Sequence, residues 1–369
     1  MTDNAKKYNL QKRILTVTNF SLEVILLIVL LFSNLSSELR DICLQITSSQ
    51  WIIVFLYLVI TGIFFEILSL PLSFYSGYVL EHKFNLSNQT LGDWILDEIK
   101  GIGIGALLGI FLGEILYFLL REYSAYWWVI GGTVFTILAI ILANLAPVLI
   151  MPIFFKFKPL NNEELKDRLI ALASKAMTKI KGVYEMDLSR KSKTANAVLA
   201  GLGNTRRIIV SDTMLENYSK EEIEVVFAHE LGHHVGKHLF KGIVFQTVII
   251  FLSFYSVNLV LNRCVNYFGF YGISDIASFP LFALVIMSIS LIALPLANGF
   301  SRRLERFADR KALELTRNSE SFITAMEKLA RQNLADRNPN ALIEFIFYSH
   351  PSVGKRIEFA KNFVSEKAT

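Results

Sequence analysis

Cysteine is scarce in this sequence, which contains only Cys43 and Cys264 among its 369 residues. Both fall in or beside loops that the topology derived below places outside the cytoplasm, where a disulfide can form. The favoured interpretation is that they are two unrelated small apolar residues at the ends of membrane spans. Because both lie across the membrane from the histidines discussed below, a cysteine nucleophile is excluded.

Two further patterns are absent. No basic stripe interleaved with stacking aromatic residues occurs, which excludes a nucleic-acid binding protein. The net charge of +5 is therefore interpreted as a consequence of membrane topology and lipid contact. No small-x-small cleavage site follows the first apolar segment before Ser36, and Glu23 interrupts that segment. We therefore expect an uncleaved membrane anchor and not a signal peptide.

Hydrophobic residues, in contrast, are abundant: they make up 53% of the chain, and the mean hydropathy is +0.44. Soluble proteins typically have an apolar share of about 45–50%, so we expect an integral membrane protein. Runs close to the ~20 residues that cross a bilayer occur at 15–33, 51–70, 102–120, 127–149, 242–261 and 279–297. The predicted fold class is mainly α, a polytopic membrane protein with about six transmembrane helices.

The basic residues orient this bundle, because short cytoplasmic loops accumulate Lys and Arg. The three loops on one side of the membrane carry only Arg40, Arg121 and Arg263 as basic residues. The other basic residues lie on the opposite side, together with both termini and the long polar stretch between the fourth and fifth spans. We therefore expect both termini and the active site to be cytoplasmic.

The sequence contains the motif HELGHH, in which His229 and His233 are four residues apart and Glu230 follows the first histidine. On a helix the two imidazoles share one face, where their neutral nitrogens can bind one Zn²⁺. The adjacent carboxylate can take a proton from a water that the metal activates. Ser219 and Glu222 form an S-x-x-E capping box that starts this helix. The pattern predicts a zinc peptidase.

A catalytic zinc ion needs a third protein ligand and an open position for water. A metzincin pattern fails, because Leu239 stands where its last histidine belongs and His238 comes one residue too early. Glu305 is the better candidate, since a hairpin of the last two spans would return it to the membrane face that His233 leaves. Asp309 shares its helical face and could accept the outer N–H of a ligand histidine. A solvated helix with salt bridges is the alternative for both acids, because four arginines surround them.

The polar stretch between the fourth and fifth spans predicts a small folded unit. Apolar residues at helical spacing predict an amphipathic helix at 161–180. Segments 183–189 and 194–212 look extended, and the cluster GLGNT at 201–205 predicts a turn between two strands of a small hairpin. Its edge strand either takes an extended peptide by strand addition or is purely structural, and spacing alone leaves both open.

These motifs resemble those of a known family. Together with HELGHH, the segments SRRLERFAD at 301–309 and SHPSVGKRI at 349–357 are similar to the membrane gluzincins that contain CaaX prenyl protease 1, a type I prenyl-protein endopeptidase. The resemblance extends to 65–94, 155–160 and 189–215, and so covers nearly the whole chain. HtpX-type heat-shock proteases share the catalytic motifs but lack the segment 65–94, which favours the prenyl-protease branch.

The resemblance implies a role for each matching residue. One zinc ion per chain would be held by His229, His233 and Glu305. Glu230 would be the general base and then the proton donor to the leaving amine, and the reaction would be peptide-bond hydrolysis without a covalent intermediate.

Four further residues match family positions that contact the substrate. His350 and Arg356 would stabilise the oxyanion of the tetrahedral intermediate. Asn196 and Ala197 would lie on an edge strand that aligns the substrate backbone. The expected partner is a peptide or protein, with a lipidated or membrane-inserted substrate as one form of it, and the second partner is the bilayer.

The resemblance also implies a barrel of helices around a water-filled chamber, with the zinc site on the cytosolic side. Glu66 and Glu114, acids inside or at the end of predicted spans, are consistent with such water, because exposure to lipid would be costly. We expect an N-terminal transmembrane domain of four spans at 1–150. A zinc metallopeptidase domain with a small β-hairpin or sheet and two further spans would follow at 151–369.

One departure concerns size. Eukaryotic members of the family are longer and have seven spans, whereas six are predicted here, with the missing element near the N-terminus. The shorter chain is typical of bacteria, so we expect a bacterial inner-membrane protein. Bacteria do not prenylate CaaX proteins, so the family name need not describe this chain's substrate. The alternatives are an HtpX-like quality-control protease and a non-enzymatic metal-binding membrane protein, and the intact Glu230 disfavours the second.

Overall fold

Long helices make up most of the chain. The computed structural model describes residues 2–201 and 206–368. Six of its helices are long and apolar enough to cross a membrane, and they confirm the six predicted spans. These helices are α1 (Thr2–Phe32), α3 (Gln50–Phe74), α5 (Leu91–Glu122), α6 (Trp127–Leu145), α11 (His238–Phe268) and α12 (Phe279–Thr316).

Two of these helices continue through short π-helical segments. The continuations are η1 (Tyr75–Val79) and α4 (Leu80–Lys83) after α3, and η2 (Ala146–Ile150) and α7 (Met151–Phe154) after α6. Pro71 precedes the first break and Pro147 lies in the second, and proline removes a hydrogen bond from the helical ladder. The predicted domain boundary after residue 150 falls within the second continuation, and the division into two domains stays a prediction.

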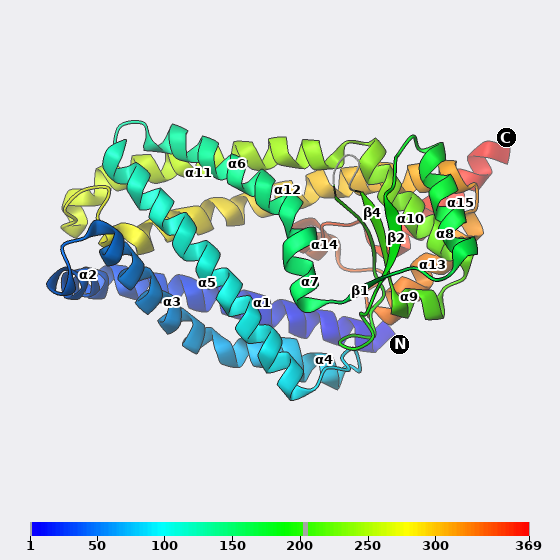
Figure 1. Ribbon diagram of the computed structural model, residues 1–369, viewed down its shortest axis with the longest axis horizontal. Coiled ribbons are helices and arrows are strands. Elements are labelled where there is room, and N and C mark those ends of the chain that lie inside the picture. The colour runs from blue at the N-terminus through cyan, green and yellow to red at the C-terminus, as the bar shows by residue number, and fades with distance from the viewer. Residues whose placement is uncertain (1, 202–205, 369) are drawn as a thin grey trace.

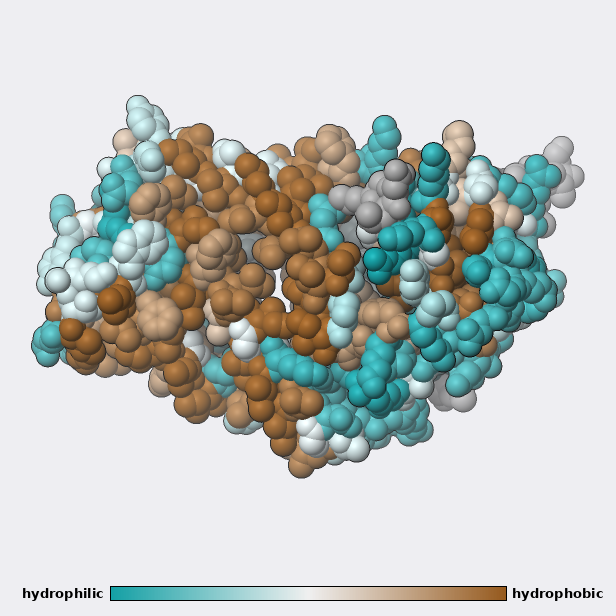
Figure 2. All heavy atoms as spheres, viewed as in Figure 1, coloured by the Kyte–Doolittle hydropathy of each residue, from teal (hydrophilic) through white to brown (hydrophobic). Residues whose placement is uncertain are grey.

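The long helices extend from one end of the molecule, and a small sheet lies at the other end (Figure 1). Both termini lie in the half that contains the sheet (Figure 1), as an even number of spans requires. Hydrophobic residues cover the region of the long helices, and hydrophilic residues gather over the sheet and at the far end (Figure 2). This distribution is the one expected of a protein that crosses a bilayer.

A cavity of about 930 Å³ lies among the spanning helices. Most of its lining comes from α3 and α5, and side chains of α1, α6 and α12 complete it. The lining is mainly apolar but includes Glu23, Glu66 and Glu98. Glu66 therefore lines a cavity, as the predicted chamber requires, whereas Glu114 is not among the residues that line it.

The end of the bundle opposite the sheet is held together by two short helices, α2 (Leu35–Ile46) and η4 (Ile276–Ser278). Buried Arg40 of α2 donates to Asp275, with 2.5 Å between Nη1 and Oδ2. Ser36 of the same helix lies 2.7 Å from the hydroxyl of Tyr57 and donates to the carbonyl oxygen of Ala277 at 2.7 Å. These contacts join the connection between the first two spans to the start of the last span.

The two cysteines are also at this end. Cys43 is fully buried in α2, Cys264 is partly exposed in α11, and both are free thiols. The two thiols are therefore not joined in the structure, and the interpretation of them as two unrelated residues stays a prediction.

A four-stranded sheet forms the centre of the soluble part. Its strands, in the spatial order β1-β2-β4-β3, are β1 (Phe157–Pro159), β2 (Gly182–Met186), β4 (Arg207–Ser211) and β3 (Ala197–Ala200). β3 and β4 pair antiparallel, with Ala197 opposite Val210, which confirms the predicted hairpin. Most of the predicted turn, residues 202–205, lies outside the described residues. β2 pairs in parallel with β4, so β3 is an edge strand.

Shorter helices complete the soluble part: α8 (Glu163–Lys175), α9 (Asp212–Asn217), α10 (Lys220–Val235), α13 (Ser319–Gln332), α14 (Ala341–Phe347) and α15 (Val353–Ala368). α8 confirms the amphipathic helix predicted at 161–180, and Asn162 caps it by accepting the N–H of Leu165 at 3.0 Å. Its buried leucines join residues of β4, α10, α12, α13 and α15 in one hydrophobic core. The histidine helix α10 therefore lies inside the core of the soluble part.

Candidate metal centre

The helix α10 carries both histidines of HELGHH and is firmly anchored. It begins with the predicted capping box, in which Ser219 Oγ accepts the N–H of Glu222 at 3.2 Å and Glu222 Oε2 accepts the N–H of Ser219 at 2.8 Å. Lys328 of α13 donates to the same carboxylate oxygen at 2.6 Å. Most of the middle of α10 is buried, so packing fixes where His229 and His233 point.

Gly232, between the two histidines, lets α10 approach α12 closely. A Cβ atom at position 232 would lie 2.8 Å from the Cα of Ala308 and 2.9 Å from its carbonyl oxygen, which is too close for carbon. Glu305 lies three residues before Ala308, about one turn along α12. α11 and α12 therefore return the chain to the histidines, as the predicted hairpin of spans requires.

The side chains of His229, His233 and Glu305 converge on one point. The two Nε2 atoms are 3.1 Å apart. His229 Nε2 lies 3.2 Å from Glu305 Oε2, and His233 Nε2 lies 3.3 Å from Glu305 Oε1. A tetrahedral zinc ion with bonds of about 2.0–2.1 Å separates its ligand atoms by about 3.3 Å. These side chains are therefore spaced as ligands of one such ion.

The surroundings of Glu305 also fit a cation. The residue is only 4% exposed, and its Oε2, although 3.2 Å from His229 Nε2, makes no hydrogen bond of suitable geometry in the described part of the chain. A buried acceptor left unsatisfied costs about 1–3 kcal/mol. A metal ion at the point of convergence would satisfy this oxygen and both ring nitrogens. The side chain of His233 is 28% exposed, so the site is open on one side.

The outer nitrogen of His229 faces an ion pair. Asp309 Oδ1 lies 2.8 Å from His229 Nδ1, which is where the predicted acceptor should be. Arg356 donates to both carboxylate oxygens, at 2.6 Å and 2.9 Å, and its Nη2 lies 3.3 Å from His229 Nδ1. The guanidinium is therefore beside the ring nitrogen that faces away from the convergence point. From this place Arg356 can hold Asp309 and His229 in position. This role is favoured over the predicted one, in which Arg356 contacts an oxyanion.

Electrostatics shift the pKa values of the candidate ligand His229 and the neighbouring Glu230 for different reasons. Burial lowers the pKa of His229, but the carboxylates of Asp309 and Glu305 outweigh burial and raise the pKa to about 9. Burial raises the pKa of Glu230, although the two histidines nearby act in the opposite direction. The side chain of Glu230 makes no hydrogen bond to the residues that the structure describes. Its carboxylate is therefore available to a water, with a raised affinity for a proton.

His350 reaches the same site from the loop between α14 and α15. Its Nε2 lies 3.2 Å from Glu305 Oε1, and its side chain is 57% exposed. A polar N–H donor therefore lies at the open side of the site, within reach of a substrate bound there.

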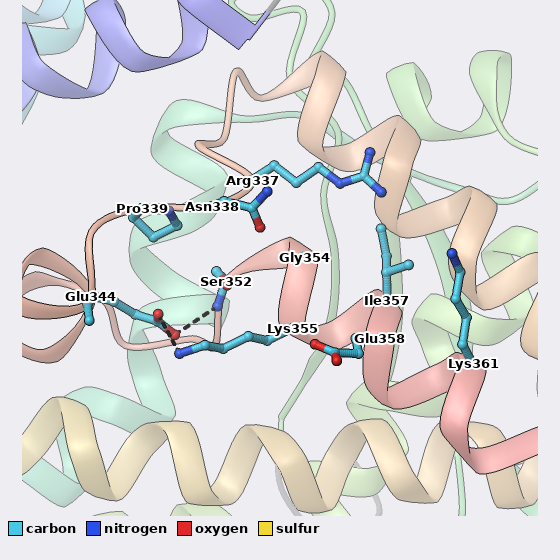
Figure 3. A pocket seen from close by; sticks show the side chains of 11 residues that line it. Arg337, Asn338, Pro339, Glu344, Ser352, Gly354, Lys355, Ile357, Glu358 and Lys361 are labelled. Carbon is cyan, nitrogen blue, oxygen red and sulfur yellow. Dashed lines mark hydrogen bonds and ion pairs between the residues drawn. The ribbon is translucent and has the colours of Figure 1, made fainter.

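The loop that carries His350 is held from two directions. Arg302 of α12 donates from Nη1 to carbonyl oxygens at the end of α14, at 2.6 to 3.3 Å. Figure 3 shows Glu344 on the other side, pointing toward Ser352 and Lys355. Its carboxylate accepts the N–H of Ser352 at 3.2 Å and the Nζ of Lys355 at 2.8 Å. The loop is therefore tied to the helix that carries Glu305.

The edge strand β3 lies against α10. Asn196, directly before this strand, is exposed, and its backbone exchanges hydrogen bonds with Ser211 through Oγ at 3.0 Å and N–H at 2.9 Å. Ala197 pairs with Val210 of β4. No described strand pairs with the other edge of β3, so its backbone groups can accept another extended segment.

Comparisons with known proteins address the whole chain. The sequence model of peptidase family M48 matches residues 159–364. The chain belongs to this family. A second model, described as the CAAX prenyl protease N-terminal segment with five membrane helices, matches residues 2–156. In that segment the described residues form four helices long enough to span a membrane, which agrees with the difference in span number noted from the sequence.

Relatives of this M48 protein cover most of its length. A metalloprotease of Bacillus subtilis named YhfN, described as uncharacterized, is 28% identical over 361 residues, which span 97% of this chain and 84% of the relative. CAAX prenyl protease 1 of Saccharomyces cerevisiae is 32% identical over 325 residues, which span 82% of this chain and 70% of the relative. The crystal structure of S. mikatae Ste24p superposes with a TM-score of 0.86 at 23% identity and covers 97% of this chain and 88% of that one, which shows a common fold.

Membership in the family makes the protein a membrane metalloprotease, and the HtpX-like alternative is not favoured.

Two residues near the site were not predicted from the sequence. His238, considered only as a metal ligand, places its Nδ1 2.9 Å from Nδ1 of His233. The fourth histidine of HELGHHVGKH was the available signal. Arg302 had no signal beyond its place about one turn before Glu305, because its partners lie more than forty residues away in the chain.

Proposed function

We propose that this M48 protein is a zinc-dependent endopeptidase that hydrolyses peptide bonds at the membrane without a covalent intermediate. His229, His233 and Glu305 would hold the zinc ion. The strongest support is the spacing of their ligand atoms, 3.1 to 3.3 Å, which fits one tetrahedral ion. The set of two imidazoles and one carboxylate is also a chemical preference of zinc.

The proposed chemistry divides between the ion and Glu230. Zinc, when bound, would lower the pKa of a water to about 7 and polarise the carbonyl that is attacked. Glu230 would accept the proton from that water and then deliver it to the leaving amine. Its freedom from hydrogen bonds and its raised pKa support this role. Asp309 would accept the N–H of His229 and so fix the orientation of that ring.

His350 would donate a hydrogen bond to the oxyanion that forms on the carbonyl oxygen. Its exposed position beside Glu305 supports this role. Arg356, which is bonded to Asp309, would act on catalysis through Asp309 and His229. Of the two residues predicted to stabilise the oxyanion, we therefore retain only His350 for direct contact.

Substrate would bind as an extended segment along the free edge of β3. Asn196 and Ala197 would align its backbone by strand addition, which the contact of β3 with α10 supports. Several relatives are named CAAX prenyl proteases. We therefore propose a substrate with a lipidated or membrane-inserted part, for which the largely apolar cavity among the spans would be suitable. The distribution of basic loops supports a cytoplasmic active site and cytoplasmic termini.

The test is zinc content and hydrolysis of a quenched farnesylated peptide by the detergent-purified protein, beside Glu230→Gln. We expect about one zinc ion per chain in both proteins and a loss of about 10²–10⁴-fold in hydrolysis for Glu230→Gln. Glu216→Gln is a matched control, because Glu216 is exposed and outside the site. A wild-type protein without zinc, or an active Glu230→Gln, would overturn the proposal. If the protein cleaved only unmodified, unfolded membrane proteins, the proposal of a lipidated substrate would be overturned, but the proposal of a zinc endopeptidase would stand.

A further inference from the structure

A further histidine, His238, adjoins the metal site without pointing into it. His238 is the first residue of α11 and is 5% exposed. Its Nδ1 lies 2.9 Å from Nδ1 of His233, and the two rings are nearly perpendicular, at 84°. The contact is therefore made to the nitrogen of His233 that faces away from His229 and Glu305.

The chain between α10 and α11 is shaped so that this contact can form. Lys237, directly before His238, has φ of +51°, in the left-handed region that L residues rarely adopt. A Cβ atom at Gly236 would lie 2.2 Å from Nε2 of His238 and 2.8 Å from the ring of Phe307. Two backbone features, a strained residue and a required glycine, therefore make room for one buried imidazole and turn it toward His233.

The tautomers of the two rings follow from the position of the metal ligands. A neutral histidine that binds a metal through Nε2 carries its hydrogen on Nδ1. Only one of two facing Nδ1 atoms can donate, so Nδ1 of His238 accepts and its own hydrogen is on Nε2. If His238 donated instead, His233 would carry its hydrogen on Nε2, where no metal could then bind.

We propose that His238 is a positioning residue that fixes the ring and the tautomer of His233 by accepting its Nδ1–H. This inference rests on the proposed metal site. The second nitrogen of His238, Nε2, is buried and has no hydrogen-bond partner among the described residues, so an aromatic ring beside it decides which tautomer is favoured. The ring of Phe307 packs against it edge to face, with centroids 5.3 Å apart at 66°. An N–H beside an aromatic ring is weakly attractive, which suits this tautomer.

Two substitutions separate this role from simple packing. In His238→Asn the amide oxygen can occupy the place of Nδ1, whereas in His238→Gln the amide group reaches the place of Nε2. Both are polar and smaller than histidine, and Gln fills more of the space. The full-length protein in detergent would be compared for zinc affinity, by competition with a chelator, and for the visible absorption bands of its Co²⁺ form. His234→Gln is the matched control, because among the described residues no hydrogen bond or ring contact joins His234 to His229, His233 or Glu305.

We expect His238→Gln to bind zinc about 10–100-fold more weakly and to shift the Co²⁺ bands, and His238→Asn to restore both toward the wild type. The control should change neither. Equal behaviour of the Gln and Asn variants, or wild-type affinity and bands in His238→Gln, would overturn the inference. Failure of the wild-type protein itself to bind zinc or Co²⁺ would instead overturn the proposed metal site, and this inference with it. Thermal unfolding of each variant shows whether a weaker affinity comes from misfolding, which would overturn a specific positioning role.

Discussion

The two proposed histidine ligands are held at their outer nitrogens by different groups. His229 faces Asp309, a carboxylate that Arg356 neutralises with two hydrogen bonds, whereas His233 faces the neutral ring of His238. The groups behind the two histidines therefore add no net negative charge to the site, and Glu305 and Glu230 are the negative charges that it contains. A bound cation would therefore keep most of its positive charge, which is what polarisation of a carbonyl requires.

The pKa of His229 predicts how the metal-free protein responds to pH. Because this pKa is raised from 6.5 to about 9, the protonated ring stabilises the folded state fully below pH 6.5. That contribution, on the order of 3 kcal/mol, is lost as the pH rises through about 9. We expect the Tm of the metal-stripped protein to fall over this window, and the affinity for zinc to rise, because zinc displaces the proton. If the Tm of the metal-stripped protein changed with pH no more than the Tm of the zinc-loaded protein, the predicted role of the His229 proton would be contradicted.

The ion pair behind His229 predicts a non-additive pair of substitutions. Asp309 is only 1% exposed and depends on Arg356 for charge compensation. Arg356→Leu removes the guanidinium and leaves that buried carboxylate with the ring of His229 as its remaining partner, so we expect a loss of about 3–5 kcal/mol in stability. Adding Asp309→Asn removes the charge but keeps an acceptor for His229. The double variant should therefore have a higher Tm than Arg356→Leu alone, and a double variant of equal or lower Tm would contradict the argument.

At the scale of the elements, the site depends on how closely α10 and α12 approach. The spacing of the histidines is local to one helix, and for that reason the sequence predicted that both would share one face, and it predicted the capping box. Glu305 was also predicted, because consecutive spans must form a hairpin. The contact of His238 was not predicted, since it depends on the left-handed conformation of Lys237, which residue type does not indicate.

The sheet illustrates the same limit. The hairpin of β3 and β4 was predicted from a turn signal between two extended segments. The parallel pairing of β2 with β4 and the addition of the three-residue β1 were not predicted, because their partners are distant in the chain and their strands are short. Helix α2 was likewise missed, because its buried contacts are with residues near the start of the last span, such as Asp275.

The close approach of the two helices predicts opposite outcomes for two glycines. Gly232→Ala would force α10 and α12 apart, because its Cβ would meet Ala308 at 2.8 Å. We expect a loss of about 1–3 kcal/mol in stability, as for overpacking elsewhere, and weaker zinc binding. Gly242→Ala in α11 is the matched control, since no atom lies within 4 Å of its Cβ and alanine favours a helix. Similar losses of Tm and zinc content in both variants would contradict the proposed role of Gly232.

At the scale of the whole molecule, two polar ends are separated by the spanning helices. One end holds the sheet, the metal centre and both termini, and the other holds the buried pair of Arg40 and Asp275 (Figures 1 and 2). Six spans place these ends on opposite sides of a membrane. Which end faces the cytoplasm is the part of our proposal that depends on the basic loops alone.

The two cysteines predict a direct test of that orientation. Cys264 is partly exposed at the end away from the metal centre, whereas Cys43 is fully buried there and should not react. We expect a membrane-impermeant maleimide to label Cys264 in intact cells. In a Cys264→Ser background, Lys175→Cys, at an exposed position of the soluble part, should be labelled only after the membrane is permeabilised. The reverse pattern would place the metal centre outside the cytoplasm, and a substrate would then have to reach it from that side.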